Sequence, residues 1–201
     1  MLNRARFSSA LNLAVELHAD QSRKGSGIPY MTHLMAVCAL VGEHDGDEDL
    51  MIAALLHDSL EDRPDRIALP AIVARFGWRV GSVVRGCTDC HSFPKPPWEQ
   101  RKQAFVERLR GESSDVKLVV AADKLHNANC WVLDLDRFGE DHWRCFNASK
   151  ERICWYMLAC LDALRSGFEN RILDRLEVAV RALEICCNAG ESIVHNPGSC
   201  G

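Results

Sequence analysis

Ionisable side chains directly follow one apolar segment of the sequence. Residues 50–56 read L-M-I-A-A-L-L, His57 and Asp58 come next, and Glu61 and Asp62 lie four positions after that pair. A helix that is apolar on every side belongs in the interior of a domain, where an unpaired imidazole or carboxylate costs on the order of several kcal/mol. A metal ion bound at the end of the helix would offset this cost. The alternative is a solvated last turn with a few ion pairs.

Two further apolar segments carry potential metal ligands at their ends. His33 begins a segment that continues L-M-A-V-C-A-L-V, and Asp123 follows the run V-V-A-A. The candidate ligands are therefore His33, His57, Asp58 and Asp123. Two imidazoles and two carboxylates suit Mn²⁺, Fe²⁺ or Zn²⁺ in a site that leaves room for water. Such an ion lowers the pKa of a bound water and supplies hydroxide at neutral pH.

The remaining charged residues near these segments suggest roles in a hydrolytic reaction. Glu61 and Asp62, one helical turn beyond the ligand pair, could accept the proton of the water or orient it. Arg23 and Lys24 lie in a loop with two glycines, and Lys124 follows the last candidate ligand. Adjacent cations on a loop are usually solvated surface. Beside a metal site, however, they predict an anionic substrate, such as a phosphate ester or anhydride.

The segments that must position these groups have the spacing of helices. Thr32 and Asp47 are plausible N-caps of the helices that carry the first ligands. The β-branched pair Val119-Val120 could belong to a strand by propensity, but the apolar spacing that continues beyond it favours a helix up to Gly139. We expect an all-α fold of about nine helices, over residues 7–19, 32–43, 49–62, 67–76, 78–87, 99–110, 113–138, 140–167 and 168–188.

Length and composition indicate one soluble globular domain. The 201 residues are 47% hydrophobic and 26% charged, with a formal net charge of −4. A small net charge with scattered basic residues argues against a general binder of nucleic acid or of membrane surfaces. The sequence contains neither an apolar run of roughly 18 residues, as a membrane span needs, nor a signal peptide. We therefore expect a cytoplasmic protein with a domain over 1–189 and a disordered tail over 190–201. The oligomeric state stays open.

Ten cysteines are more than usual, but most lie within helical patterns, where thiols behave as small apolar groups. Without a secretory signal, we expect no disulfide framework. Cys87, Cys90 and His91 fit the C-x-x-C-H pattern of covalent haem attachment. That attachment normally accompanies export, which the sequence does not support. A zinc site on Cys87 and Cys90 would need a second ligand pair that the sequence does not clearly offer.

The spacing of His33, His57-Asp58 and Asp123 resembles the signature of the HD-domain metal-dependent phosphohydrolases. Four stretches resemble more specifically the hydrolase domain of RelA/SpoT-type guanosine tetraphosphate enzymes and their small stand-alone relatives. They are H-A-D-Q-S-R-K-G-S-G-I-P-Y-M-T-H, A-A-L-L-H-D-S-L-E-D, R-F-G-W-R-V-G-S-V-V-R-G-C-T-D and A-A-D-K-L-H-N. Together they cover roughly residues 18–130.

The resemblance implies a single HD-domain helical bundle with Mn²⁺ on the four candidate ligands. Glu61 and Asp62 match the catalytic pair of the family, and Arg23 and Lys24 match basic residues beside the bound nucleotide. Asn127 matches an asparagine that contacts the substrate. The reaction of the family removes pyrophosphate from the 3′ position of a guanosine ribose. The implied partner is thus a phosphorylated nucleotide.

Some positions depart from the family pattern. Leu34, Ser59 and Lys124 stand where the family usually has proline, threonine and arginine. Residues 94–105 and 143–148, together with Trp155-Tyr156, resemble a related group of small HD proteins. These departures leave the metal site intact but open the substrate to other nucleotides or phosphate esters.

Two further hypotheses come from other classes of protein. One is a catalytically idle HD module that binds a nucleotide, which predicts the loss of a ligand or of the Glu61-Asp62 pair. The other is a diiron oxygenase, which needs additional histidines around a second metal. His18 and His126 lie near the motifs, but neither is a ligand in the hydrolase family. We expect His18 to be a structural hydrogen-bonding residue.

Overall fold

The computed structural model describes residues 2–90, 92 and 94–189. The predicted tail and His91 of the C-x-x-C-H pattern lie outside the described residues. The described chain consists of helices, with one isolated bridge between Ser22 and Pro29, so the prediction of an all-α fold is confirmed. The helices are α1 Arg4–His18, α2 Met31–Glu43, α3 Glu48–Leu56, α4 Ser59–Asp62, α5 Leu69–Phe76, α6 Trp78–Cys87, α7 Trp98–Arg110, α8 Ser114–Phe138, the 3₁₀ helix η1 Gly139–Cys145, α9 Lys150–Leu164 and α10 Ile172–Ala189.

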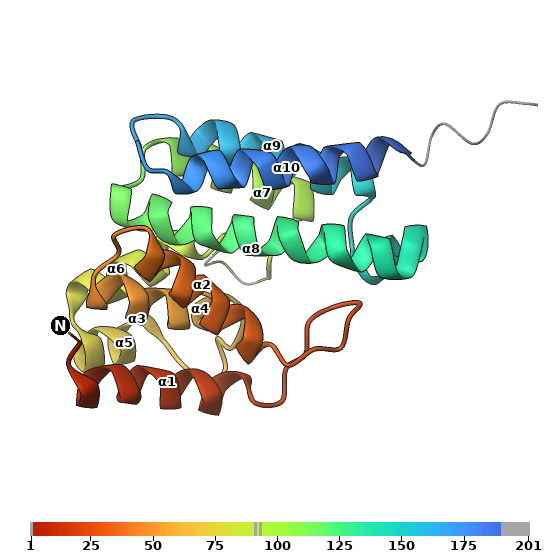
Figure 1. Cartoon of the computed structure of the whole chain (residues 1–201). Coiled ribbons are helices and arrows are strands. Elements are labelled where there is room, and N and C mark those ends of the chain that lie inside the picture. Colours follow the sequence, from red (N-terminus) through yellow and green to blue (C-terminus); the bar gives the residue numbers. More distant parts are fainter. Residues whose placement is uncertain (1, 91, 93, 190–201) are drawn as a thin grey trace, which may run out of the picture.

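Helix α8 runs through the middle of the molecule (Figure 1). Helices α1–α6 lie on one side of it, and α7, α9 and α10 lie on the other. The Ser113 hydroxyl caps α8 by accepting a hydrogen bond from the Val116 amide, and Gly139 ends the helix with a φ of 63°. Ala121 and Ala122 are fully buried. The long helix therefore joins both halves of one hydrophobic core. It also places Asp123, the residue after Ala122, in a buried position.

The segment predicted as one helix over 49–62 forms two helices instead. Helix α3 ends at Leu56, α4 begins at Ser59, and His57 and Asp58 form the turn between them. The Ser59 hydroxyl donates to the Leu56 carbonyl, and His57 Nδ1 lies 2.8 Å from a backbone carbonyl of the same helix. Such local side-chain bonds compete with the helical backbone pattern. Asp47 is the N-cap of α3, as expected.

Other differences also arise from local chemistry. Thr32 does not cap α2, because its hydroxyl donates to the carbonyl of Pro29 and the helix already begins at Met31. The expected helix over 140–167 is interrupted between η1 and α9, where Ser149 supplies a new N-cap.

The expectation about disulfides is wrong for one pair of cysteines. The sequence predicts no disulfide framework, whereas the structure joins Cys154 of α9 to Cys187 of α10 in a disulfide. This pairing depends on how the two helices pack and cannot be read from the spacing of the residues. The other seven cysteines of the described chain are free.

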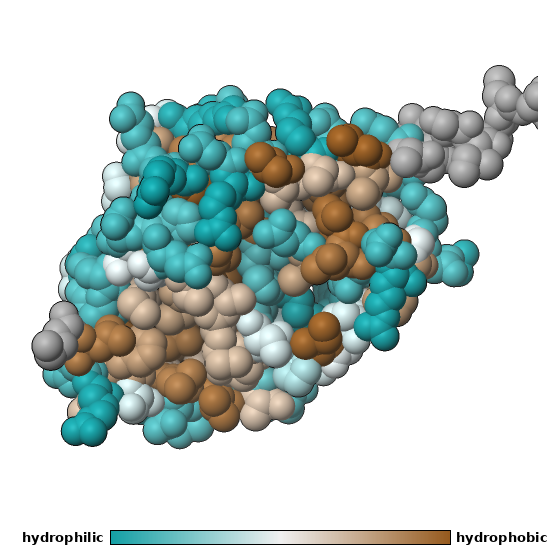
Figure 2. Space-filling view, viewed as in Figure 1, coloured by the Kyte–Doolittle hydropathy of each residue, from teal (hydrophilic) through white to brown (hydrophobic). Residues whose placement is uncertain are grey.

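The face in Figure 2 carries both hydrophilic and apolar areas. Apolar side chains gather at the lower left, on the side of α1–α3, and again toward the right-hand end of α8 and α10. Leu133, Val178 and Ile185 are among the most exposed apolar residues of these helices. Among the described residues, none of the helices combines the length and the apolar character that crossing a bilayer requires.

Candidate metal centre

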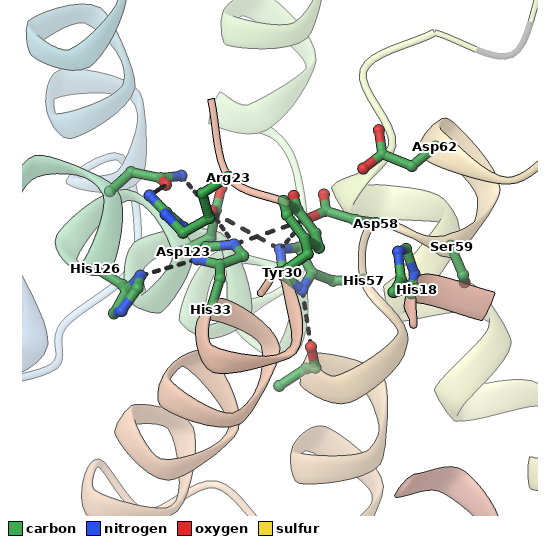
Figure 3. A network of polar contacts seen from close by, with 12 residues as sticks. His18, Arg23, Tyr30, His33, His57, Asp58, Ser59, Asp62, Asp123 and His126 are labelled. Carbon is green, nitrogen blue, oxygen red and sulfur yellow. Dashed lines mark hydrogen bonds and ion pairs between the residues drawn. The ribbon is translucent and has the colours of Figure 1, made fainter. Parts of the chain in front are cut away.

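The four candidate ligands meet where three helical segments converge (Figure 3). His33 comes from α2, His57 and Asp58 from the turn between α3 and α4, and Asp123 from α8. Asp58 Oδ2 lies 3.0 Å from His57 Nε2 and 3.6 Å from His33 Nε2. Asp123 Oδ1 lies 3.3 Å from His33 Nε2 and 3.8 Å from His57 Nε2. Within the described chain, His33, His57 and Asp58 form a possible metal site, with their ligand atoms within 4.8 Å of one another.

The hydrogen bonding of His57 fits a bound cation. Its Nδ1 lies 2.8 Å from the Ala54 carbonyl, which can only accept, so Nδ1 carries the proton. The other nitrogen, Nε2, is buried and has no hydrogen-bond partner. It faces the Asp58 carboxylate at 3.0 Å, so a positive charge, either a proton or a metal ion, must lie between the two atoms. A divalent ion would supply that charge and satisfy the buried nitrogen.

The electrostatics of the site point the same way. Burial disfavours a charge on His57, but the neighbouring Asp58 and Asp123 carboxylates hold its pKa well above the ordinary value. Burial likewise disfavours ionised Asp123, yet the Lys124 cation and the neighbouring His33 and His57 imidazoles hold its pKa well below the usual range. The carboxylates thus stay ionised in a buried setting, as cation binding requires.

Three side chains fix the ligand carboxylates. The Tyr30 hydroxyl donates to Asp58 Oδ2 at 2.6 Å. Asn127 donates its amide to Asp123 Oδ1 at 2.6 Å, and Lys124 donates to Oδ2 of the same carboxylate at 2.7 Å. Such hydrogen bonds orient metal ligands. The sequence did not single out Tyr30, because only the fold brings it against Asp58.

His126 contacts a ligand histidine. Its Nδ1 lies 2.8 Å from Nδ1 of His33. Burial lowers the pKa of His126 to about 4, so its ring is neutral near pH 7 and can accept this hydrogen bond. Either ring can donate this hydrogen bond, and it leaves His33 Nε2 facing the Asp58 and Asp123 carboxylates.

The acidic pair lies on α4, at a cavity of about 160 Å³ beside the ligands. The Glu61 side chain is partly buried and accepts from the backbone amide of Asp89 at 3.3 Å, and burial raises its pKa. Asp62 lies at the exposed rim, where desolvation and the nearby Asp58 carboxylate raise its pKa. A carboxylate of raised pKa beside a metal site suits proton transfer near neutral pH.

Three of the four predicted substrate-binding residues are linked to the metal ligand Asp123. Arg23 donates to the Asn127 carbonyl oxygen at 3.0 Å, and Asn127 in turn donates to Asp123. Lys24 is exposed and lines the same cavity of about 250 Å³ as Arg23. Lys124 is held between Asp123 and the Tyr156 ring, so its charge is already partnered. The substrate-binding roles of these residues stay predictions.

The loop that carries Arg23 and Lys24 needs its first glycine for two reasons. Gly25 has a φ of +82°, and a Cβ there would lie 2.7 Å from Cε1 of His142. Gly27, with a φ of +69°, has open space around its Cα. The 3₁₀ helix η1 therefore buttresses the cationic loop.

Aromatic residues line a cavity beside the metal site, and several of them come from the segments that resemble small HD proteins. A cavity of about 310 Å³ runs from Glu61 between two aromatic pairs, Trp98 with Tyr156 and Trp131 with Phe146. Lys102 lines this cavity and pairs with the buried Asp89 carboxylate at 2.8 Å. Part of this wall comes from the segments 94–105 and 143–148 that depart from the alarmone hydrolase pattern.

The two cysteines of the C-x-x-C-H pattern lie on different cavities. Cys87 lines the metal cavity, where burial raises the pKa of its thiol well above the ordinary value. Cys90 lines a separate cavity behind α4. Neither belongs to a metal-ligand cluster within the described chain.

Comparison with known proteins identifies the family. The HD domain family model matches residues 10–137. The guanosine-3′,5′-bis(diphosphate) 3′-pyrophosphohydrolase MESH1 of Danio rerio is 35% identical over 137 residues, which cover 66% of this chain and 71% of that protein. A probable guanosine-3′,5′-bis(diphosphate) 3′-pyrophosphohydrolase of Synechocystis is 36% identical over 59% of this chain, but the match spans only 16% of that longer protein.

Solved structures agree with this assignment. A metazoan orthologue of SpoT, described as hydrolysing ppGpp and acting in starvation responses, superposes with a TM-score of 0.72 at 27% identity, covering 90% of this chain and 97% of that one. The protein lmo0812 of Listeria monocytogenes gives a TM-score of 0.67 at 25% identity, covering 74% and 96%. The chain belongs to the HD-domain family and is homologous to MESH1 and the SpoT-type hydrolases.

Proposed function

We propose that this chain is a metal-dependent phosphohydrolase that releases pyrophosphate from the 3′ position of guanosine 3′,5′-bis(diphosphate). One observation carries the proposal. The buried Nε2 atom of His57 has no hydrogen-bond partner and faces the ionised carboxylates of Asp58 and Asp123. The Glu61-Asp62 pair lies one helical turn away. The names of the relatives support the substrate.

The proposed metal is Mn²⁺, with Fe²⁺ and Zn²⁺ as alternatives. His33, His57, Asp58 and Asp123 would hold it, because both imidazoles turn Nε2 toward the two carboxylates and these atoms converge. When bound, the ion supplies a water of lowered pKa and a Lewis acid for the phosphoryl oxygens. Tyr30 and Asn127 keep the two ligand carboxylates oriented.

Glu61 and Asp62 act on the attacking water in this proposal. The oxygen of that water bonds to phosphorus while the bond from phosphorus to the ribose 3′ oxygen breaks. Glu61 accepts the proton of the water, since its raised pKa makes it a stronger base than an exposed carboxylate. Asp62 orients the water from the rim of the cavity, and the leaving 3′ oxygen takes up a proton as pyrophosphate departs.

Arg23, Lys24 and Asn127 bind the nucleotide in this proposal. The first two provide positive charge on a loop beside the metal ligands, in a chain that is acidic overall. Phosphate groups pair well with such cations. The Trp131 and Phe146 rings line the same cavity and offer a face for a nucleobase. We further infer that residues 1–189 make up a single hydrolase domain, in keeping with their continuous core.

A second candidate is the hydrolysis of another nucleotide or phosphate ester. It is favoured by the wall of Trp98, Lys102 and Tyr156, which is built largely from a segment that departs from the alarmone hydrolase pattern. The idle binding module is less well supported, because the four ligands and both acidic residues are present. Assaying a panel of nucleotides with Mn²⁺, and identifying pyrophosphate or monophosphate as the product, separates the three possibilities.

A further inference from the structure

A buried histidine that is not a candidate ligand lies near Asp62 (Figure 3). His18, in the last turn of α1, is only 1% exposed. Its Nδ1 lies 2.7 Å from the side-chain oxygen of Gln21, and the Gln21 amide donates to Asp62 Oδ2 at 2.6 Å. Three side chains from α1, the following loop and α4 therefore form a hydrogen-bonded chain that ends on a catalytic candidate.

The chemistry of the groups fixes the direction of this chain. An ionised carboxylate can only accept, so Gln21 must turn its NH₂ group toward Asp62. Its carbonyl oxygen then faces His18, which must carry its proton on Nδ1. The backbone holds the glutamine in place, since its amide donates to the His18 carbonyl and its carbonyl accepts from the Tyr30 amide.

A second contact connects the same imidazole to the metal site. The His18 ring stacks on the Tyr30 ring, with centroids 5.5 Å apart and planes 26° apart. Tyr30 donates its hydroxyl to the ligand Asp58. His18 thus supports a metal ligand through one neighbour and the acidic pair through another.

The burial of His18 requires a reason. Its Nε2 has no hydrogen-bond partner in the described structure, and leaving a buried polar nitrogen unpaired costs free energy. An apolar side chain would avoid that cost but could not donate to Gln21. Within the described residues, Gln21 is the only side chain that hydrogen-bonds to Asp62, which otherwise stands at the exposed rim.

We propose that His18 and Gln21 are positioning residues, which hold the Asp62 carboxylate in the orientation that the reaction requires. This inference rests on the proposed hydrolase function. Replacing Gln21 should lower kcat without changing metal content, because Gln21 touches no candidate ligand side chain. It should have little further effect once Asp62 itself has lost its carboxylate.

The test is a double-mutant cycle of Gln21→Leu and Asp62→Asn, with His18→Phe as a second route to the same loss. Gln103→Leu, an exposed position on α7 without side-chain hydrogen bonds in the described structure, is the matched control. We expect Gln21→Leu to lower kcat by about 10-fold, with KM, metal content and Tm nearly unchanged. In the Asp62→Asn background the same change should lower kcat by less than about 2-fold. Equal effects in both backgrounds, or an unchanged kcat in the wild-type background, would overturn the proposal.

A spectroscopic measurement tests the hydrogen bonds from His18 through Gln21 to Asp62 independently of turnover. In ¹⁵N-labelled protein, His18 should be the Nδ1–H tautomer, and its signals should shift in Gln21→Leu and in Asp62→Asn but not in Gln103→Leu. An Nε2–H tautomer, or His18 signals that stay the same in both Gln21→Leu and Asp62→Asn, would overturn these hydrogen bonds. Lack of turnover by the wild-type protein would instead overturn the proposed function. It would also overturn the catalytic role of the His18–Gln21–Asp62 hydrogen bonds.

Discussion

His57 Nε2 lies 3.0 Å from Asp58 Oδ2, although neighbouring residues of a continuous helix point their side chains in different directions. The break between α3 and α4 makes this approach possible, because both residues lie in the turn that separates the helices. The Asp58 carbonyl accepts from the backbone amides of Glu61 and Asp62 and so starts α4 directly after the ligand pair. One local irregularity therefore places two ligands and the acidic pair around the same cavity.

Loss of a ligand carboxylate should abolish metal binding. We expect Asp58→Ala to lower the metal content, measured by elemental analysis, from about one divalent ion per chain to near zero, because the site loses one of its two carboxylate ligands. Asp65→Ala, an exposed aspartate beyond α4, is the control and should keep its metal. Equal metal content in Asp58→Ala and the wild type would show that the ligand assignment is wrong.

The acidic pair should matter for turnover and not for metal content. Glu61→Gln and Asp62→Asn keep the size of each side chain but remove its basicity. Each should lower kcat by on the order of 10²-fold, the usual contribution of a general base or a group that positions the attacking water. Both variants should retain the metal. Wild-type rates in both variants would show that the pair is only surface charge.

Arg23 should contribute to substrate binding. Removing a charge-assisted hydrogen bond costs about 1.5–3 kcal/mol, or roughly 10- to 150-fold in affinity. We expect Arg23→Ala to raise KM within this range at unchanged metal content, with Arg171→Ala, an exposed arginine outside the site, as the control. An unchanged KM would place the substrate elsewhere.

The cationic loop allows a matched pair of glycine substitutions. Gly25→Ala combines a positive φ with a clash against His142, whereas Gly27→Ala imposes a positive φ alone. A residue with a Cβ pays roughly 1–2 kcal/mol in this conformation. Gly25→Ala should therefore displace the loop and raise KM more than Gly27→Ala does. Equal KM values in the two variants would contradict the buttressing by His142.

Asp47 gives a prediction about stability and pH. Its carboxylate caps α3, so Asp47→Ala should lower the free energy of unfolding by about 1 kcal/mol at pH 7, and Asp47→Asn by less. Partial desolvation opposes ionisation of Asp47, but hydrogen bonds from Arg79 and from the Leu50 amide lower its pKa in the folded protein. A folded-state pKa below the unfolded value makes the stabilisation complete above the unfolded pKa, near 4. It is lost as the pH falls through the folded-state pKa.

Denaturant unfolding of the wild type and Asp47→Ala at pH 7 and pH 3 measures this effect. The difference in the free energy of unfolding between the two proteins should shrink at the lower pH. A difference that stays the same at both pH values would contradict the role of the ionised carboxylate.

The sequence predicted the all-α fold because apolar residues recur at helical spacing in nearly every segment. It also predicted which residues cluster. Ionisable residues at the ends of apolar runs are costly to bury alone, which is why His33, His57, Asp58 and Asp123 were predicted to share one site. The structure brings their side chains together.

Other features lay beyond the sequence because they depend on tertiary contacts or on local hydrogen bonds. The break after Leu56 arises from side-chain bonds within the helix end. Tyr30 and Gln21 reach the site only because the loop between α1 and α2 folds back through the pairing of Ser22 with Pro29. The spacing of apolar residues predicts which face of a helix is buried, but it does not predict the conformation of a loop.

The most direct test of the account is the product formed from guanosine 3′,5′-bis(diphosphate) in the presence of Mn²⁺. The purified protein should convert it to guanosine diphosphate and pyrophosphate, and Asp58→Ala should not. Release of monophosphate from simple nucleotides instead would move the protein to the wider class of HD phosphohydrolases. Stable metal binding without turnover of any phosphate compound in the panel would contradict the proposed activity.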